Sequence, residues 1–600
     1  MKYTKPKMID FGDYLPGGHH MPQWVLQPFE NFLGFTALNV AHEKCEIALE
    51  NGSPRNFFNL ACEHLNLLYD LSGLENIPAE GPCVIVCNHP HGMSDGLMFG
   101  DVAMKVRQDV RIVVNEFLHC VRGMRQYEIT VDVYGGDAAK RANMQGMREI
   151  LKWLRGGHCI LVFPSGSAAS WSEQDGRVID DPWQENIAAL IRKTGATVVP
   201  MHISGHTGRL FQWVTRVAKE HRAALLPREI KRDGRMRHRI ALGKPVSPAT
   251  IATFATDAAL SDYLRLCSML QRYEDAPAAA AAPARDMAPV DAGEQADVLQ
   301  GEIDALPADA LYYSSEVTGL QVYGATAAQI PHLMHELGVQ RELTFRAVGE
   351  GSGTACDLDR YDQHYVHLIM WDSREHRLAG AYRIGRTDDI VRDHGVKGIY
   401  NAEFFDFAPE FVEFVSRGIE MGRAFITPPY QRQAASLDTL WMGIGSFLNR
   451  NPQYRYLYGT VSVSADFSKR SRSLILSYLR ANAMLQEHVA HVTPHTPPTD
   501  LGLNSEDERL LPTALPEVKL LASLVSELEA DGKSIPVLLR QYLRLGGRMV
   551  SFNIDNDFGG TLDCLVVVDL AYTPERLLKR YCGEAEATRK QAEWRAADAR

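Results

Sequence analysis

Short apolar runs alternate with amphipathic stretches between residues 76 and 273. The runs are rich in β-branched residues and are bounded by turn-forming residues, which is typical of buried strands. Five runs predict strands, at residues 84–87, 110–114, 129–133, 159–163 and 197–203. Two longer stretches, 140–154 and 182–193, carry apolar residues at helical spacing. The alternation predicts an α/β domain with a largely parallel sheet over residues 76–275.

The segments on either side of this domain have different patterns. Residues 1–75 predict a helical leader, with helices over 27–49 and 56–71. The leader could pack on the domain or lie on a membrane, and packing is the interpretation we favour. Residues 276–297 are rich in Ala and Pro without apolar periodicity, which predicts a disordered linker between two domains.

A second α/β domain is predicted over residues 298–572. Two apolar runs separated by a short turn, 365–371 and 378–385, predict a β-hairpin. A helix over 437–448 and a strand over 456–463 follow. The last residues, 573–600, are charged and Ala-rich and predict a frayed helical tail.

Composition narrows the class of protein. Of 600 residues, 45% are hydrophobic and 23% charged, which is ordinary for globular domains. The net charge of −11 argues against a general nucleic-acid partner. The ten cysteines show no paired metal spacing, so we expect core thiols in a reducing cytosol and no metal site. No secretory signal and no run of about 18 apolar residues is visible, so a role in lipid metabolism would be peripheral.

The loop after the first predicted strand carries the candidate chemistry. The strand Cys83–Cys87 runs directly into Asn88-His89-Pro90-His91-Gly92, and Asp95 follows. A histidine at a strand end beside a carboxylate can form a dyad, in which the imidazole takes a proton from an attacking hydroxyl. The alternative is a polar surface loop with incidental histidines.

This loop resembles the first motif of glycerolipid O-acyltransferases, and more closely that of hemolysin-like lysophospholipid acyltransferases. The spacing departs from the usual Asn-His, four residues, Asp. Five residues separate His89 from Asp95, and three separate His91 from Asp95. The resemblance implies that His89 is the base, that Asp95 is its partner, and that Asn88 belongs to the binding site.

Three further segments resemble the later motifs of the same family, in the family's order. In residues 117–132, Arg122 and Arg125 would hold the polar head of the acceptor through bidentate guanidinium contacts. Phe163-Pro164-Ser165-Gly166 resembles the third motif, with Ser165 in place of the usual glutamate. Residues 198–205 resemble the fourth. For either arginine alone, ordinary surface solvation is the alternative.

Residues 228–239 are strongly basic. They contain six Lys or Arg residues against Glu229 and Asp233. The segment could touch anionic lipid head groups. A solvated loop explains the composition equally well.

The second domain resembles the N-acyltransferase branch of the GNAT superfamily, especially the enzymes that acylate ornithine. The resemblance singles out five residues: Arg383, Glu403, Asp406, Glu420 and Arg423. Glu420 would accept a proton from the acceptor amine, and Arg383 or Arg423 would hold the amino-acid carboxylate. A structural ion-pair network among these residues is the alternative.

The turn at residues 431–436 has no glycine, where the resembled domains use glycines to approach the pyrophosphate of coenzyme A. This favours acyl carrier protein as the acyl donor and partner, and leaves acyl-coenzyme A open. No permanently bound cofactor is implied.

Both resemblances together are those of the bifunctional ornithine lipid synthase family. They imply that the second domain acylates the amine of a small amino acid with a 3-hydroxyacyl chain, and that the first domain then esterifies the hydroxyl. A cytoplasmic enzyme peripheral on the inner membrane surface is expected. A lysophospholipid acyltransferase with an accessory GNAT-like domain is the alternative, and a non-catalytic membrane-associated protein is a third.

Overall fold

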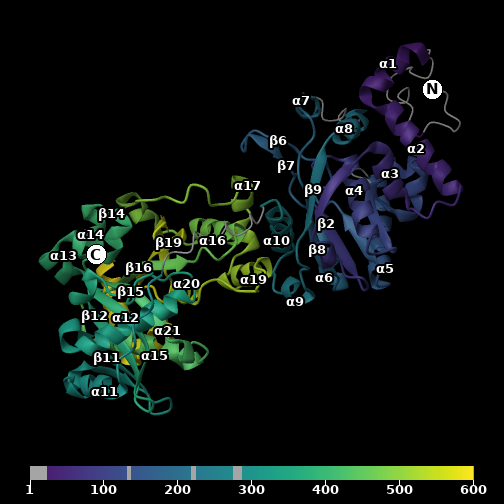
Figure 1. The fold of residues 1–600 in the computed structure, drawn as a ribbon. Helices are drawn as coiled ribbons and strands as arrows, with labels where there is room; N and C mark the ends of the chain where they lie inside the picture. The colour runs from purple at the N-terminus through teal and green to yellow at the C-terminus, as the bar shows by residue number, and fades with distance from the viewer. Residues whose placement is uncertain (1–7, 9–22, 132–136, 218–223, 274–286, 599–600) are drawn as a thin grey trace. The chain divides into compact units, whose positions relative to one another are not determined.

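The computed structural model describes residue 8 and residues 23–131, 137–217, 224–273 and 287–598, and the chain divides into two compact units (Figure 1). The first unit comprises Met1–Glu274 together with Asn504–Pro516, and the second comprises Asp275–Leu503 and Glu517–Arg600. Each unit contains one large sheet. This confirms the predicted α/β class with two domains.

The sheet of the first unit has seven strands in the order β1-β9-β8-β2-β5-β3-β4. All neighbours are parallel except β8 and β9. The strands are β1 (Leu68–Ser72), β2 (Cys83–Cys87), β3 (Val110–Asn115), β4 (Glu128–Val131), β5 (Cys159–Val162), β8 (Thr197–Ile203) and β9 (Arg237–Leu242). The central β2 is buried along its whole length, as expected for a parallel strand covered on both faces.

The helices of this unit surround the sheet, with α10 packing on β8 and β2, α4 on β3, and α5 on β4 and β5. They are α1 (Gln23–Leu33), α2 (Phe35–Glu50), α3 (Phe57–Leu65), α4 (Met93–Met104), α5 (Asp137–Arg155), α6 (Glu185–Thr194), α7 (Arg209–Val217), α8 (Leu226–Asp233), α9 (Pro248–Ile251) and α10 (Asp257–Leu270). A small hairpin, β6 (Ser170–Ser172) and β7 (Arg177–Ile179), precedes α6.

The predicted helical leader needs two corrections. The helix predicted over 27–49 is broken at Gly34, whose φ of +86° separates α1 from α2. The helix predicted over 56–71 ends at Leu65, because Asn66 adopts a left-handed conformation and its side chain donates to the Gly234 carbonyl. The residues that follow form β1, an edge strand of the sheet.

A short segment distant in sequence belongs to the first unit. Helices α17 (Ser505–Glu508) and α18 (Leu511–Ala514) lie in it, and α18 packs on α10. Tyr273 donates a 2.8 Å hydrogen bond to Asp507, and Arg509 donates to both oxygens of Asp175 at 2.8 Å. The range 298–572 is therefore not one uninterrupted compact unit.

The sheet of the second unit has eight strands in the order β10-β11-β12-β13-β15-β16-β19-β18. Neighbours are antiparallel except β15 and β16. The strands are β10 (Leu311–Ser314), β11 (Leu320–Thr326), β12 (Val366–Asp372), β13 (Arg377–Arg386), β15 (Gly418–Ile426), β16 (Tyr456–Val463), β18 (Arg548–Asp555) and β19 (Thr561–Asp569). The predicted 365–385 hairpin is confirmed as β12 and β13.

The helices of the second unit are α11 (Ala296–Ala305), α12 (Pro331–Arg346), α13 (Thr387–His394), α14 (Pro409–Val415), α15 (Ala434–Arg450), α16 (Lys469–Asn482), α19 (Val518–Leu528), α20 (Val537–Arg544), α21 (Glu575–Cys582) and α22 (Glu584–Asp598). A two-stranded sheet joins β14 (Phe405–Phe407) to β17 (Val492–Pro494). Among the described residues, no helix is both long and apolar enough to span a bilayer.

The C-terminal residues do not form the predicted frayed tail. Helix α21 packs on α15, and α22 buries Ala587 and Trp594. The Lys590 ammonium donates to the Leu448 carbonyl at 2.7 Å, near the C-terminus of α15, where a cation is favoured. Of the predicted linker, residues 276–286 lie outside the described part, while Ala288 and Asp291 donate backbone hydrogen bonds to residues 353 and 355.

Candidate active sites

The predicted dyad lies between the end of β2 and the start of α4. The Nδ1 atom of His89 is 3.0 Å from Oδ2 of Asp95. The same oxygen accepts backbone N–H groups of His91 at 2.9 Å and Gly92 at 3.0 Å. The buried Asp95 carboxylate also sits in the first turn of α4, where the helix dipole favours a negative charge.

Contacts from other elements fix the position of His89. Its backbone N–H donates to Asp180, and its carbonyl accepts from Ala169. Its ring stacks on Phe163 with a centroid separation of 4.1 Å and remains 18% exposed. Because Nδ1 faces a carboxylate, Nε2 is the ring nitrogen that can accept a proton from a substrate hydroxyl.

The second histidine of the motif has a different environment. His91 is completely buried, with Nδ1 3.1 Å from Asp233 Oδ1 and Nε2 2.9 Å from the Ser204 carbonyl. A carbonyl can only accept, so Nε2 carries a proton, and Nδ1 faces a carboxylate. Burial opposes the charged form, but the hydrogen bond to Asp233 and the nearby Asp95 raise the pKa of His91 to about 9. His91 is therefore a structural imidazolium.

The other predicted residues of the first unit lie at three places. Asn88 is buried and bridges to Ile203 on β8, donating at 3.0 Å and accepting at 2.9 Å. The turn after β5 contains Pro164, Ser165 and Gly166; the Ser165 hydroxyl donates to the Ser167 carbonyl at 3.0 Å, and Gly166 has a φ of +69°.

Arg122 and Arg125 are exposed on the 3₁₀ helix Arg122–Tyr127, where Arg125 donates to the His119 carbonyl at 3.0 Å. No contact joins either arginine to the dyad among the residues that the structure describes. Their proposed role in holding the acceptor head group stays a prediction.

The second site is a cleft of about 360 Å³ in the second unit. Its lining is polar and aromatic: Asp359, Arg360, Tyr361, Tyr400, Glu403, Phe404, Arg423, Asp555, Asp557 and Phe558. Two of the five predicted residues, Glu403 and Arg423, are therefore in the wall. Arg360 and the Tyr361 hydroxyl both donate to Glu403, at 3.0 and 2.8 Å.

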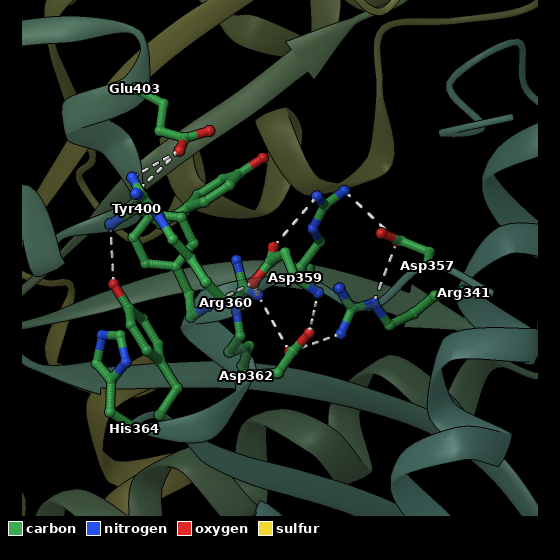
Figure 2. A network of polar contacts seen from close by, with 12 residues as sticks. Arg341, Asp357, Asp359, Arg360, Asp362, His364, Tyr400 and Glu403 are labelled. Carbon is green, nitrogen blue, oxygen red and sulfur yellow. Dashed lines mark hydrogen bonds and ion pairs between the residues drawn. The ribbon is translucent and has the colours of Figure 1, made fainter. Parts of the chain in front are cut away.

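A network of three arginines and three aspartates adjoins the cleft and shares Asp359 and Arg423 with its wall; Figure 2 labels most of these residues. Buried Arg383 donates to Asp359 at 2.6 Å and to Asp362 at 3.1 Å. Burial alone would raise the pKa of Asp362, but its cationic neighbours hold it well below its ordinary value. The other contacts are Arg341 to Asp362 at 2.8 Å and to Asp357 at 3.2 Å, and Arg423 to Asp357 and Asp359 at 3.5 Å each.

Glu420 and Asp406 lie outside the cleft lining. Glu420 is buried and accepts from the Tyr365 hydroxyl, from the backbone N–H groups of Tyr400 and Asn401 at 3.1 and 2.7 Å, and from the Asn401 side chain. Burial raises its pKa above the usual range. Asp406 is exposed on β14 beside His495, at 3.3 Å.

The two parallel strands next to the cleft separate. β15 and β16 pair only over residues 418–420 and 456–458, although both strands continue. β15 also carries a bulge opposite residues 381–383, where Arg423 has a φ of +46°. Beyond these residues the ladder between the two strands ends. Bulges of this kind redirect side chains at functional sites.

Two protein families match different parts of the chain. Residues 41–266 match the family described as acyltransferase, and residues 340–442 match the acetyltransferase (GNAT) domain. A glycine N(alpha)-acyltransferase of Bacteroides thetaiotaomicron is 31% identical over 277 residues, covering 43% of this chain and 80% of that protein. A lyso-glycine lipid O-acyltransferase of Phocaeicola vulgatus is 24% identical over 257 residues, covering 41% and 87%.

An L-ornithine N(alpha)-acyltransferase of Brucella abortus is 24% identical over 256 residues, covering 42% of this chain and 81% of that protein. The chain belongs to the bifunctional ornithine lipid synthase family. It is an acyltransferase with an acyltransferase domain followed by a GNAT domain. The matched N-acyltransferases are named for two amino acids, glycine and ornithine.

Sequence reasoning missed several residues of the second site. Asp357, Asp359 and Asp362 lie in a loop before β12, and Asp555 and Asp557 lie at the β18–β19 turn. The density of Asp in both turns was a visible signal. Which turns meet could be known only from the strand order.

Proposed function

We propose that the chain makes an amino-acid-containing membrane lipid by two successive acyl transfers. The observation that carries this proposal is the presence of two different sites on one chain: a hydroxyl-activating dyad in the first unit and a charged cleft in the second. The first step forms an amide on an amino acid, and the second forms an ester on the hydroxyl of the new acyl chain.

The cleft suits a zwitterionic acceptor. Arg423 and Arg360 offer guanidinium groups to a carboxylate, whereas Asp359, Glu403 and Asp555 offer oxygens to ammonium groups. The acidic excess in the wall favours an amino acid with a cationic side chain, so we propose ornithine or a similar amino acid. Arg383 supports the wall from below, because its contacts are with Asp359 and Asp362.

The donor of the first transfer is a 3-hydroxyacyl carrier protein in this proposal. The separation of β15 and β16 leaves room for the amide-rich arm that carries the acyl thioester. The glycine-free segment 431–436 includes the first residues of α15, so side chains there hinder the close approach of a pyrophosphate to the helix N-terminus. Exposed Arg417 and Arg432 could steer an acidic carrier protein.

In the second transfer, His89 acts as the general base. Its Nε2 takes the proton of the lipid hydroxyl as the oxygen attacks the thioester carbonyl, and the thiol leaves with a proton. Asp95 stabilises the imidazolium that forms and fixes the tautomer. Acyl carrier protein or coenzyme A would present the second chain.

The substrate of the second step is a single-chain amphiphile, so the chain works at a lipid surface, which we propose is the cytoplasmic face of the inner membrane. Because the two sites share one polypeptide, the intermediate meets the second site at a raised effective concentration.

The test is lipid mass spectrometry of a host that lacks amino-acid lipids and expresses the chain. The wild-type chain should give a diacylated amino-acid lipid, and Arg423→Gln should give none. His89→Ala should accumulate the mono-acyl amide. His158→Ala is the matched control, because its Nδ1 also faces an aspartate, Asp109, at 3.1 Å. Altered phospholipid acyl chains without amino-acid lipids would instead support a lysophospholipid acyltransferase.

Donor choice is tested with the full-length His89→Ala chain, which isolates the first transfer. Turnover should require the hydroxyacyl carrier protein and fall as salt screens the docking charges. Equal, salt-insensitive turnover with hydroxyacyl-coenzyme A would reject this donor.

A further inference from the structure

Large apolar side chains are exposed on two helices of the first unit. On α1 they are Trp24, Phe29 and Phe32, at 79%, 56% and 59% exposure, and on α7 they are Trp213 and Val217, at 60% and 67%. Three of the five are tryptophan or phenylalanine on a helix of only eleven residues. Exposed aromatic groups of this density mark a surface that binds a partner or a membrane.

The two helices belong to one surface, with α8 between them. Leu33 of α1, Phe211 and Val214 of α7 and Leu226 of α8 pack in one apolar cluster. The Arg228 guanidinium of α8 lies 4.7 Å from the centre of the Phe32 ring. The three helix labels also lie at the same end of this unit (Figure 1). We call this surface the α1–α7–α8 face.

The charge of the face is the reverse of the charge of the whole chain, which is −11. On α8 the acidic side chains, Glu229 and Asp233, are buried, whereas Lys231 is exposed and Arg228 half-buried. Arg235 is exposed just beyond the helix. Arg209 and Arg216 are exposed on α7, and Arg216 pairs with Glu173. Basic groups therefore interleave with the exposed aromatic groups.

The face also adjoins the dyad. The Leu226 side chain lies over Gly92, where an added Cβ would come 2.7 Å from its Cδ2 atom. At the other end of α8, Asp233 holds His91, two residues from His89. A surface placed against α1, α7 and α8 would therefore lie close to the loop that carries the base.

We propose that the α1–α7–α8 face docks on an anionic phospholipid bilayer, with the aromatic side chains in the interface and the Lys and Arg groups on lipid phosphates. The proposal rests on the lipid substrate of the proposed function and adds the surface that reaches it. Tryptophan, with an apolar body and one polar N–H group, suits the head-group region, and nearby basic residues strengthen attraction to anionic lipid. The positive charge of the face complements the negative charge of the lipid phosphates, which favours a bilayer as the partner.

The experiment is sedimentation of the full-length chain with vesicles, without any acyl substrate. Vesicles of phosphatidylcholine with about 30 mol% phosphatidylglycerol should bind the wild-type chain much more strongly than phosphatidylcholine alone. The variant Phe29→Ser/Trp213→Ser should bind at least about tenfold more weakly. Lys231→Glu/Arg235→Glu should remove most of the preference for anionic lipid and its salt dependence.

Val317→Ser/Tyr572→Ser is the matched control, because these side chains are 87% and 61% exposed in the second unit and should not matter for binding. Unchanged melting temperatures show that each variant is folded. Fluorescence adds a second readout: vesicles should shift the emission of Trp213 to shorter wavelength, measured as the difference between wild type and Trp213→Phe.

Equal vesicle binding by the wild type and both face variants would overturn the proposal. So would a chain that ignores vesicles but dimerises through this face, seen as a mass change in light scattering that Phe29→Ser/Trp213→Ser abolishes. Because binding is measured without catalysis, an inactive chain that still docks would refute the proposed function and leave the docking face intact.

Discussion

The two sites are built in opposite ways. The dyad joins His89 and Asp95, six positions apart in one loop, at the end of a strand buried along its whole length. The cleft collects side chains from Asp359 to Phe558, brought together by an eight-stranded sheet. A local motif can be recognised in the sequence, whereas a site assembled by topology is visible only once the strands are ordered.

The electrostatics of the two sites differ as well. The dyad has one buried carboxylate facing a half-buried imidazole, so a proton can be moved between the ring and a ligand. In the network that adjoins the cleft, three guanidinium groups already face three carboxylates. Such a network fixes charge and geometry. The first site suits proton transfer, and the second suits binding.

The largest expected effect comes from the dyad. His89→Ala should lower kcat/KM of ester formation by about 10²–10⁴-fold, because it removes the general base, while amide formation stays unchanged. The measurement is the rate of each transfer with defined substrates. His158→Ala should leave both rates unchanged. If His91→Ala abolished ester formation while the folded His89→Ala chain kept its rate, the two histidines would have been assigned the wrong way round.

The next effect tests the cleft. Arg383→Met leaves Asp359 and Asp362 short of a buried partner, so the second unit should lose about 3–5 kcal/mol of unfolding free energy. The measured quantity is the denaturation midpoint of the second unit. Ester formation by the first unit should be retained. Arg392→Met is the control, since its pairs with Asp389 and Asp393 are exposed. A loss as small as the control's would mean that the network is not a structural support.

The same contrast explains what the sequence could predict. The strands β2, β5 and β8 were predictable because their burial on both faces leaves continuous apolar runs. Two strands of the first unit's seven-stranded sheet were missed. Edge strand β1 has no buried residue, and β9 begins with Arg237 and His238. The helix stop at Asn66 depends on the distant Gly234 carbonyl, which no local signal reveals.

The two candidate sites differ in the same way: one could be predicted from local sequence, and the other depends on contacts between distant residues. The dyad needed only the spacing within one loop, which places His89 and Asp95 together. The cleft residues Asp359 and Asp555 are far apart in sequence, and they line one cleft because of the fold. The docking of Asn504–Pro516 on the first unit likewise depends on contacts such as Arg509 with Asp175, which no composition shift marks.

A third prediction concerns pH. The pKa of His91 rises from 6.5 to about 9 on folding, so its charged form stabilises the first unit. The stabilisation, roughly 3 kcal/mol, is complete below pH 6.5 and is lost as pH rises through 9. Unfolding free energies of the wild type and His91→Gln should therefore converge between these pH values. His158→Gln is the control. A wild-type-minus-variant difference independent of pH would show that His91 is neutral.

The smallest effect is expected at Glu420, and it decides how the two sites compare. The sequence prediction makes Glu420 the base of the second site, as His89 is of the first. In the structure both of its oxygens accept from protein donors, and it lies outside the cleft lining. We therefore expect Glu420→Gln to lower kcat/KM of amide formation by less than about tenfold, since a saturated carboxylate acts by positioning Tyr400 and Asn401.

The pH dependence of the same variant adds a second measurement. Burial raises the pKa of Glu420 in the folded chain. The free energy of unfolding should therefore fall as pH rises from the pKa of Glu420 in the unfolded chain to its pKa in the folded chain, because the buried carboxyl group must ionise. The neutral Gln should remove this dependence and lose only the hydrogen bonds that an amide nitrogen cannot accept. Asp406→Asn, at an exposed carboxylate, is the control. A loss of 10²-fold or more in a normally stable Glu420→Gln chain would restore Glu420 as the base, and each site would then contain its own proton acceptor.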